Sequence, residues 1–176
     1  MDVAMHDRYM QQAVTLARVR ERGLRLPYVG AVLVAPDGSV LSRGRKRFIE
    51  GTSLLVHAER DAIDKVPESV AGATLYTTLE PCYEARLRSH HNHIFHSCAE
   101  LIVESGIRCV IVGRWDDVMM NGRGIGYLRN HRVKVIHYLD AIPPKRRPRH
   151  EALLRNATDS GSPSYLPLAS DEAFLS

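Results

Sequence analysis

One histidine, two cysteines and one glutamate of this chain have the types and spacing that metal-assisted chemistry needs. His57 and Glu59 stand two positions apart at the expected start of a helix, and Cys98 opens another expected helix. Cys82 follows shortly after an expected strand. Zinc prefers nitrogen and sulfur ligands, and three protein ligands with an open fourth position describe a catalytic site. We therefore expect His57, Cys82 and Cys98 to bind Zn2+, because thiolates and metal ligands are favoured at helix starts.

Glu59 is the candidate proton shuttle of this site. A bound zinc ion lowers the pKa of a coordinated water toward neutrality. In the middle of a helix, His57 and Glu59 would point apart, but at a helix start both can face a ligand beyond the helix end. A carboxylate there could take a proton and hand it to a leaving group. Two other interpretations stay open: chance placement of buried core residues, and a closed structural zinc site whose fourth ligand is a histidine from 83–97.

The apolar pattern predicts elements that would bring these residues to one edge of a sheet. Helices are expected at 7–21, 56–66, 99–104 and 122–130, and strands at 28–35, 39–43, 74–79, 109–115 and 133–139. A turn at 36–38 would close a hairpin. Strand–helix–strand alternation in the second half implies parallel strands. The expected fold class is α/β, a three-layer α-β-α sandwich with a mixed five-stranded sheet and a ligand site beyond the strand ends.

Composition fits one soluble domain followed by a basic tail. The chain has 176 residues, of which 44% are hydrophobic and 25% charged, with a formal net charge of +4. No apolar run is long enough to span a bilayer, and the N-terminus lacks a signal-peptide core, so we expect a cytoplasmic protein with no membrane partner. We assign 1–140 to the domain, with 81–98 as an enlarged loop between the ligands. The Pro- and Ser-rich segment 141–176 is expected to be a loose tail, with a helical turn at 152–156.

Three motif pieces resemble the H-x-E…P-C-x-x-C signature of the zinc-dependent nucleobase deaminases. The pieces are His57-Ala58-Glu59, Pro81-Cys82 and Cys98. The chain thus resembles the cytidine deaminase-like superfamily over about 7–139. Fifteen residues, 83–97, separate the cysteines, where the usual motif has two. The segments 27–30, 98–107 and 122–125 are similar to the deaminase domain of riboflavin biosynthesis, whose gap is also widened.

The resemblance implies a zinc-dependent hydrolytic deaminase, a hydrolase that acts on C–N bonds of cyclic amidines. Glu59 would be the proton shuttle, and backbone groups near Ala58, Pro81 and Cys82 would hold the reacting edge of the substrate. The implied partner is a small amino-heterocycle: a base, nucleoside, nucleotide or riboflavin-type diaminopyrimidine. A homodimer or higher homo-oligomer is also implied. Two alternatives stay open: a deaminase acting on tRNA or single-stranded nucleic acid, which is not favoured, and a non-catalytic zinc-binding regulator or scaffold.

Further substrate contacts are expected at three places. His90, His91 and His93 lie between the cysteines and either line the pocket or are polar loop residues. Arg45 belongs to a basic run and is a candidate for holding a substrate phosphate, with a solvated loop as the alternative. Trp115 ends the strand expected at 109–115 and would wall the pocket or pack at its rim.

Overall fold

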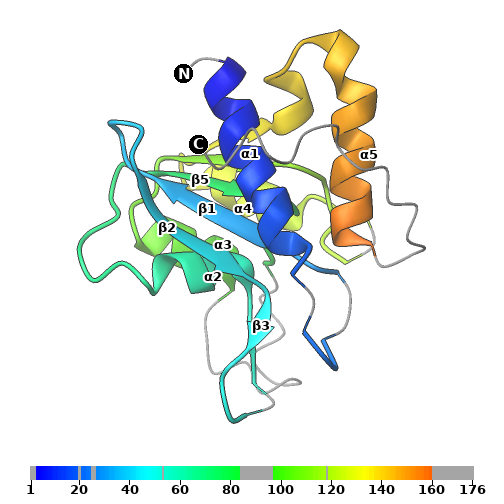
Figure 1. Cartoon of the computed structure of the whole chain (residues 1–176). Helices are drawn as coiled ribbons and strands as arrows, with labels where there is room; N and C mark the ends of the chain where they lie inside the picture. The colour runs from blue at the N-terminus through cyan, green and yellow to red at the C-terminus, as the bar shows by residue number, and fades with distance from the viewer. Residues whose placement is uncertain are drawn as a thin grey trace.

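A mixed sheet forms the centre of the computed structural model, with strand order β2-β1-β5-β6-β7 (Figure 1). Its strands are β1 (Gly30–Val34), β2 (Val40–Arg45), β5 (Thr74–Thr77), β6 (Cys109–Val112) and β7 (Lys134–His137). The structure describes residues 3–19, 21–24, 27–52, 54–83, 97–117 and 119–159.

The direction of the strands places the end of β5 beside the ends of β6 and β7. β1 is antiparallel to β2, as the expected hairpin at 36–38 requires, and it is also antiparallel to β5. β5, β6 and β7 are parallel, with Thr77 paired to Val112 and Val112 paired to His137. The carboxyl ends of these three strands therefore share one edge of the sheet. The predicted mixed five-stranded sheet is confirmed.

Helices cover both faces of the sheet and complete the three predicted layers (Figure 1). The helices are α1 (Val3–Ala17), α2 (Ala58–Ile63), α3 (Cys98–Glu104), α4 (Arg123–Asn130) and α5 (Arg147–Thr158), with the short 3-10 turns η1 (Tyr138–Asp140) and η2 (Pro144–Arg146). α1 and α5 lie on one face, and α2, α3 and α4 lie on the other. Within the described ranges, no helix has the length and apolar character needed to cross a bilayer.

Side chains at alternate positions of the strands belong to two separate hydrophobic cores, one on each face of the sheet. Leu33 and Leu75 pack with residues of α2, α3 and α4. Val34 and Tyr76 pack with residues of α1 and α5. Because successive side chains of a strand point to opposite faces, a central strand with helices on both sides must be apolar throughout. All five residues of β1 are accordingly buried.

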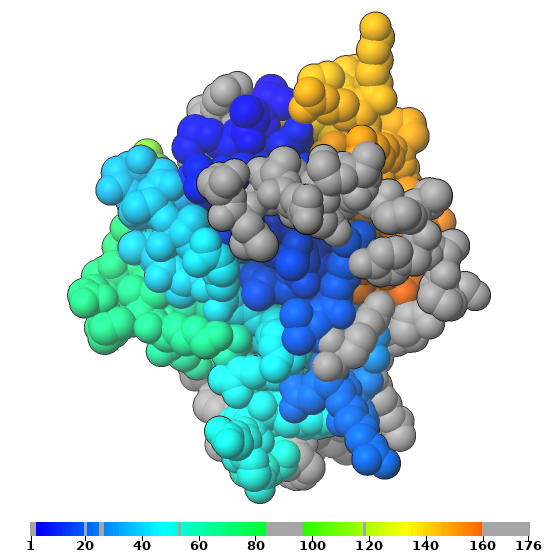
Figure 2. Space-filling view, in the orientation of Figure 1, coloured from blue at the N-terminus to red at the C-terminus, as the bar shows by residue number. Residues whose placement is uncertain are grey.

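Two segments differ from the sequence-based expectation. The segment 44–54, where the sequence predicted neither helix nor strand, contains β3 (Arg47–Phe48), which pairs with β4 (Leu55–Val56) in a two-stranded arm. In Figure 2 this arm projects beside the turn at 21–24. The helical turn expected at 152–156 is part of the 12-residue helix α5, so 147–158 is not a loose tail.

Only one turn of α5, at 152–156, was predicted from the sequence, because few residues of this helix are apolar. Its contact with the rest of the molecule depends on Leu154 and Ala157, which are buried in the core that α1 also covers. Two such positions are too few to give a clear helical period in a basic segment. The remainder of the expected tail, 160–176, lies outside the described residues.

Candidate metal centre

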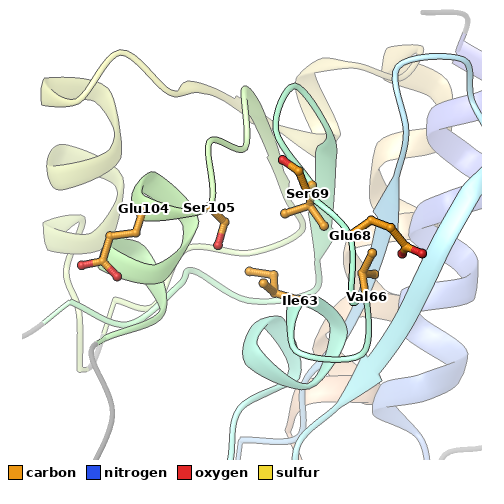
Figure 3. A pocket seen from close by; sticks show the side chains of 7 residues that line it. Ile63, Val66, Glu68, Ser69, Glu104 and Ser105 are labelled. Carbon is orange, nitrogen blue, oxygen red and sulfur yellow. The ribbon is translucent and has the colours of Figure 1, made fainter.

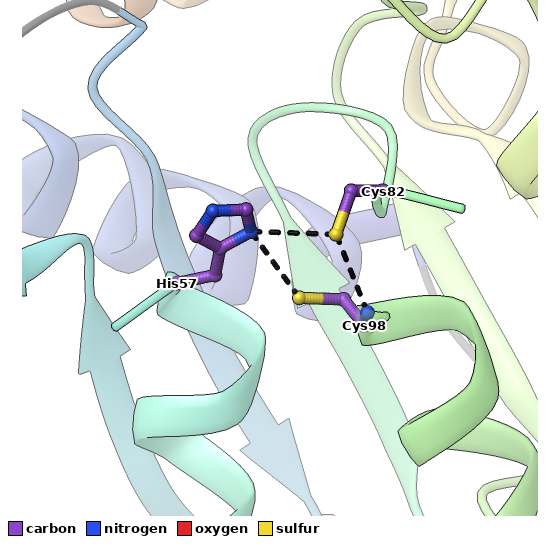
Figure 4. Close-up of side chains that lie close together, drawn as sticks. All are labelled: His57, Cys82 and Cys98. Atoms are coloured by element: carbon purple, nitrogen blue, oxygen red, sulfur yellow. Dashed lines mark hydrogen bonds between the residues drawn. The ribbon is translucent and has the colours of Figure 1, made fainter. Parts of the chain in front are cut away.

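The three predicted ligand side chains converge at one point (Figure 4). The Nδ1 atom of His57 lies 3.4 Å from Sγ of Cys82 and 3.5 Å from Sγ of Cys98. All three ligand atoms lie within 4.8 Å of one another. Zinc bonds of ordinary length in a tetrahedral site put nitrogen and sulfur about 3.5 Å apart. The donor types and their spacing therefore fit a zinc ion.

The ligands lie where three elements begin or end on the same side of the sheet. His57 immediately precedes α2, Cys98 is the first residue of α3, and Cys82 follows β5. The backbone N–H of Cys98 donates to Sγ of Cys82 over 3.3 Å. The N–H of Ala99 donates to the carbonyl of Cys82 over 3.0 Å. The turn at Cys82 is thus fastened to the first turn of α3.

A capping box defines the start of α3. The side chain of Ser97 accepts a hydrogen bond from the backbone N–H of Glu100, and the Glu100 carboxylate accepts one from the N–H of Ser97 over 2.9 Å. This reciprocal pair is a strong helix-start signal, and the Ser-x-x-Glu pattern is visible in the sequence. It places Cys98 on the first helical position, at the helix start where the sequence predicted it.

Burial and mutual contact shift the pKa values of Cys82 and Cys98 in opposite directions. A hydrogen bond from Cys98 lowers the pKa of Cys82 well below its usual value, and the neighbouring His57 adds to this effect. The same thiol–thiol bond, together with burial, raises the pKa of Cys98. Burial lowers the pKa of His57, but the hydrogen bond and charge of Cys82 outweigh burial and raise it. The cluster therefore favours a thiolate at Cys82, the form that binds metals.

Glu59 lies in the first turn of α2 beside the ligand cluster. Only 3% of its surface is exposed. The hydroxyl of Thr77 donates a hydrogen bond to Oε1 of Glu59 over 3.0 Å. Burial raises the pKa of Glu59, and the charge of His57 partly opposes that shift. A buried carboxyl group with a raised pKa at a metal cluster suits proton transfer.

Asp61 anchors the same helix to the arm that precedes it. The side chain of Asp61 is almost fully buried, and it accepts hydrogen bonds from the backbone N–H of Arg45 (3.0 Å), the Arg47 guanidinium (2.8 Å) and the Lys65 ammonium (2.7 Å). Burial raises the pKa of Asp61, but these hydrogen bonds outweigh burial and lower it. The contacts fix α2, and with it His57 and Glu59, against β2 and β3.

The backbone around Ala58 and Pro81 is packed without spare room. A Cβ atom at Gly44 would lie 2.1 Å from the carbonyl oxygen of Ala58. A Cβ atom at Gly124 would lie 2.0 Å from the carbonyl oxygen of Pro81. Glycine therefore lets β2 and α4 approach these two positions directly. Ala58 and Pro81 are both buried beside the cluster, and their contact with a substrate remains a prediction.

Glu80 organises the loop between β6 and α4. Its carboxylate, 3% exposed, accepts backbone hydrogen bonds from Asp116 (3.2 Å), Gly122 (3.3 Å), Gly124 (3.0 Å) and Ile125 (3.3 Å). Free N–H groups at a helix start favour such a negative charge. Glu80 thus holds the start of α4 against the turn that carries Cys82.

The other residues that the sequence predicted to contact the substrate lie in different surroundings. The Arg45 guanidinium forms an ion pair with Glu21 over 3.3 Å. Trp115 stacks on His137 of β7, with ring centroids 4.6 Å apart. His90, His91 and His93 lie outside the described residues. The roles of Arg45 and Trp115 in substrate binding remain predictions.

Two residues near Glu59 were not singled out by sequence reasoning. Lys46 is largely buried, and its ammonium donates to the carbonyl of Pro27 over 3.0 Å. Burial lowers the pKa of Lys46, whereas the charge of Glu59 raises it. Thr77 lies at the end of β5 and bonds Glu59. The basic run at 43–47 indicated a cation here, but the pattern could not tell which one turns inward.

A separate cavity of about 250 Å³ lies away from the ligand cluster (Figure 3). It is lined by Ile63 at the end of α2, by Val66 shortly after that helix, and by Glu104 and Ser105 at the end of α3. His57 and Cys98 stand at the opposite, N-terminal ends of these two helices. The cavity is therefore not part of the metal centre.

Comparisons with known proteins identify the family. The cytidine and deoxycytidylate deaminase zinc-binding region matches residues 3–114. The riboflavin biosynthesis protein RibD of Actinobacillus pleuropneumoniae is 36% identical over 146 residues, which cover 77% of this chain and 35% of that protein. The diaminohydroxyphosphoribosylamino-pyrimidine deaminase of Buchnera aphidicola subsp. Schizaphis graminum is 33% identical over 136 residues, 74% of this chain and 83% of that protein.

A solved structure agrees with these relatives. The diaminohydroxyphosphoribosylaminopyrimidine deaminase/5-amino-6-(5-phosphoribosylamino)uracil reductase of Thermotoga maritima superposes with a TM-score of 0.63 at 30% identity, over 89% of this chain and 40% of that one. The chain thus spans little more than a third of the RibD relative from Actinobacillus. The family match covers well over half of the chain and contains His57, Cys82 and Cys98. This chain belongs to the cytidine and deoxycytidylate deaminase zinc-binding family.

Proposed function

We propose that this protein is a zinc-dependent hydrolytic deaminase that converts an amino group on a small pyrimidine-like ring into a carbonyl and releases ammonia. The observation that carries the proposal is the convergence of His57, Cys82 and Cys98, with Glu59 buried beside them. His57, Cys82 and Cys98 would hold the zinc ion, which when bound supplies a Lewis acid that activates water. A closed structural site would leave the buried Glu59 without a role.

Glu59 would carry the protons of the reaction. Its carboxylate would accept a proton from the attacking water and deliver it to the ring nitrogen, and would then move the proton of the added hydroxyl group to the departing amine, which leaves as ammonia while the ring carbon becomes a carbonyl. The hydrogen bond from Thr77 and the burial of Glu59 keep the carboxylate in a fixed, water-poor position. Such a fixed position lowers the cost of aligning the reacting groups.

The substrate class that we propose is an aminopyrimidine of the riboflavin-pathway type, with other small bases, nucleosides and nucleotides as alternatives. The Buchnera relative named for a phosphoribosylamino-pyrimidine matches over 83% of its own length. The backbone N–H of Arg45 and the guanidinium of Arg47 contact Asp61 of α2, and the charge of Lys46 interacts with Glu59. Cations at this position suit a substrate that carries a phosphate.

A screen for ammonia release tests the proposal. Zinc-loaded protein is offered diaminopyrimidine phosphates, cytosine derivatives, aminopurines and pterins, and ammonia is measured by a coupled enzymatic assay. We expect turnover of at least one aminopyrimidine and a loss of roughly 100- to 10,000-fold in Glu59→Ala with its zinc retained. Turnover that is equal in the wild type and in Glu59→Ala, or no ammonia from any compound, would show that the proposal is wrong.

We further propose a homodimer or higher homo-oligomer, on the strength of the resemblance to the superfamily. Light scattering of the purified protein measures the assembly, and a monomer at micromolar concentration would contradict it. Binding to single-stranded nucleic acid is a separate measurement. Tight binding that weakens steeply with salt would favour a deaminase acting on nucleic acid instead.

A further inference from the structure

The last residue of β5 places a hydroxyl group directly beneath Glu59. Thr77 is fully buried, and its Oγ1 lies 3.0 Å from Oε1 of Glu59. The alternation of the strand turns Tyr76 toward α1 and Thr77 toward α2. The contact therefore joins the central sheet to the helix that carries Glu59.

The same hydroxyl also touches the segment that leads to Cys82. Oγ1 of Thr77 lies 3.1 Å from the carbonyl oxygen of Leu79. The Glu59 carboxylate and the Leu79 carbonyl are both acceptors, so they share the single hydroxyl proton of Thr77. Thr77 thereby connects the residues on either side of the metal centre, Glu59 on α2 and the turn after β5.

Packing alone does not explain why position 77 carries a hydroxyl group instead of an apolar side chain. The neighbours of Thr77 along β5, Leu75 and Tyr76, are fully buried and belong to the hydrophobic cores. Valine has the same branched shape and a strong preference for strands. What valine lacks is the bond to Glu59, so the hydroxyl points to a role at the site.

Glu59 needs such a partner to keep one orientation. Its side chain has several rotatable bonds, and ordering it costs conformational entropy. Among the residues that the structure describes, Thr77 supplies the side-chain hydrogen bond to the Glu59 carboxylate. A proton-transferring group works best when a rigid neighbour holds it in its productive geometry.

We propose that Thr77 is a positioning residue that orients the Glu59 carboxylate for proton transfer. This inference rests on the proposed deaminase function, because it assigns Thr77 a part in the same site. Thr77 would act through Glu59, to which its hydroxyl donates a hydrogen bond. Removing its hydroxyl should therefore slow the chemical step more than it weakens substrate binding.

Three variants of β5 separate the hydroxyl from the shape of the side chain. Thr77→Val keeps the shape and removes the hydroxyl, Thr77→Ser keeps the hydroxyl, and Thr74→Val is the matched control at the first residue of the same strand. We expect a roughly tenfold or greater loss of kcat in Thr77→Val, with KM changed less than about twofold. Thr77→Ser and Thr74→Val should retain nearly full kcat, and all three should bind one zinc ion as the wild type does.

Kinetics and crystal structures together decide the inference. Full kcat in Thr77→Val, or an equal loss in Thr77→Ser, would overturn it while leaving the deaminase function standing. If the wild type releases no ammonia, the proposed function fails, and crystal structures of the zinc-loaded proteins then decide. A Glu59 side chain that is displaced or adopts several orientations in Thr77→Val supports the positioning role. An unchanged Glu59 overturns it.

Discussion

At the scale of single residues, the metal centre depends on which sulfur atoms reach His57. Cys82 and Cys98 approach Nδ1 of His57 to 3.4 and 3.5 Å. Cys109, the third cysteine, lies half-buried in β6 and packs against the core on the α1 face. Burial raises the pKa of Cys109, so it stays a neutral thiol under conditions in which Cys82 favours the thiolate. The three cysteines thus have different chemistry.

The cysteines give a matched test of zinc binding. Cys98→Ser should weaken zinc binding by about 100-fold or more, because it removes a ligand from the centre. Cys109→Ser should keep one zinc ion per chain. Metal content measured by mass spectrometry after dialysis, with zinc titrations for affinity, checks both. Zinc retained in full by Cys98→Ser would contradict the assignment of the ligands.

At the scale of elements, the position of α4 against the turn after β5 shapes the site. Glu80 draws the start of α4 toward the turn by accepting its backbone N–H groups. Gly124 permits the close approach, since a Cβ there would meet the Pro81 carbonyl at 2.0 Å. Gly126, two residues later on the same helix, has nothing within 4 Å of an added Cβ. The helix α4 therefore contains one glycine, Gly124, in tight contact with a neighbouring segment and another, Gly126, with open space around it.

These two glycines should respond oppositely to alanine. Gly124→Ala forces α4 away from Pro81 and should destabilise the fold by about 1–3 kcal/mol, with weaker zinc binding because Cys82 adjoins Pro81. Gly126→Ala should stabilise it by about 0.5–1 kcal/mol, since alanine favours an open helical position. Urea unfolding of both variants measures the free energies. Similar changes in the two variants would show that the close approach does not govern stability.

At the scale of the whole molecule, a buried polar cluster joins the two ends of the chain. The hydroxyl of Tyr138 donates to Oδ1 of Asp7 over 2.7 Å, and Nδ1 of His150 lies 2.7 Å from the same hydroxyl. Arg146 adds an ion pair with Asp7 at 2.8 Å. Since Tyr138 gives its proton to Asp7, Nδ1 of His150 must be the donor to Tyr138. The cluster packs α5 against α1, and we propose that the domain extends through α5.

Two histidines, His150 of this cluster and His137 of β7, should make the free energy of unfolding depend on pH. Burial lowers the pKa of His150, and burial likewise lowers the pKa of His137. The unfolded chain therefore binds protons more readily than the folded chain as the pH falls below about 6.5. The stabilisation that depends on these uncharged histidines should be fully present above that pH. It should be lost as the pH falls toward the lower pKa values that His150 and His137 have in the folded chain.

His150→Asn isolates the contribution of one histidine. Asparagine offers an N–H donor near the position of Nδ1 but does not titrate. The free energy of unfolding should fall less between pH 7.5 and pH 5.5 in the variant than in the wild type, as measured by urea titrations with zinc removed from both. Parallel declines in the two proteins would show that His150 does not cause the pH dependence.

Much of the fold and the ligand set followed from local patterns. Apolar runs and helical periods identified all five strands of the sheet, the helix that follows His57 and the helix that begins at Cys98, although several of the expected boundaries were shifted by a few residues. The short two-stranded arm was missed, and only a turn of α5 was predicted. The arm depends on the pairing of β3 with β4, and α5 depends on a few contacts such as the burial of Leu154 and Ala157. Neither kind of contact leaves a periodic pattern in the sequence.

The sequence by itself determined the donor chemistry of the site and the order of its elements, because residue types and hydrophobic periods are local properties. Only the tertiary structure decided which neighbouring groups serve that site. It paired Arg45 with Glu21, turned Lys46 inward, and set Thr77 beneath Glu59. It also joined Asp7 to Tyr138 across 131 residues of chain. Such contacts arise from the packing of whole elements, so the identity of the two residues does not reveal them in advance.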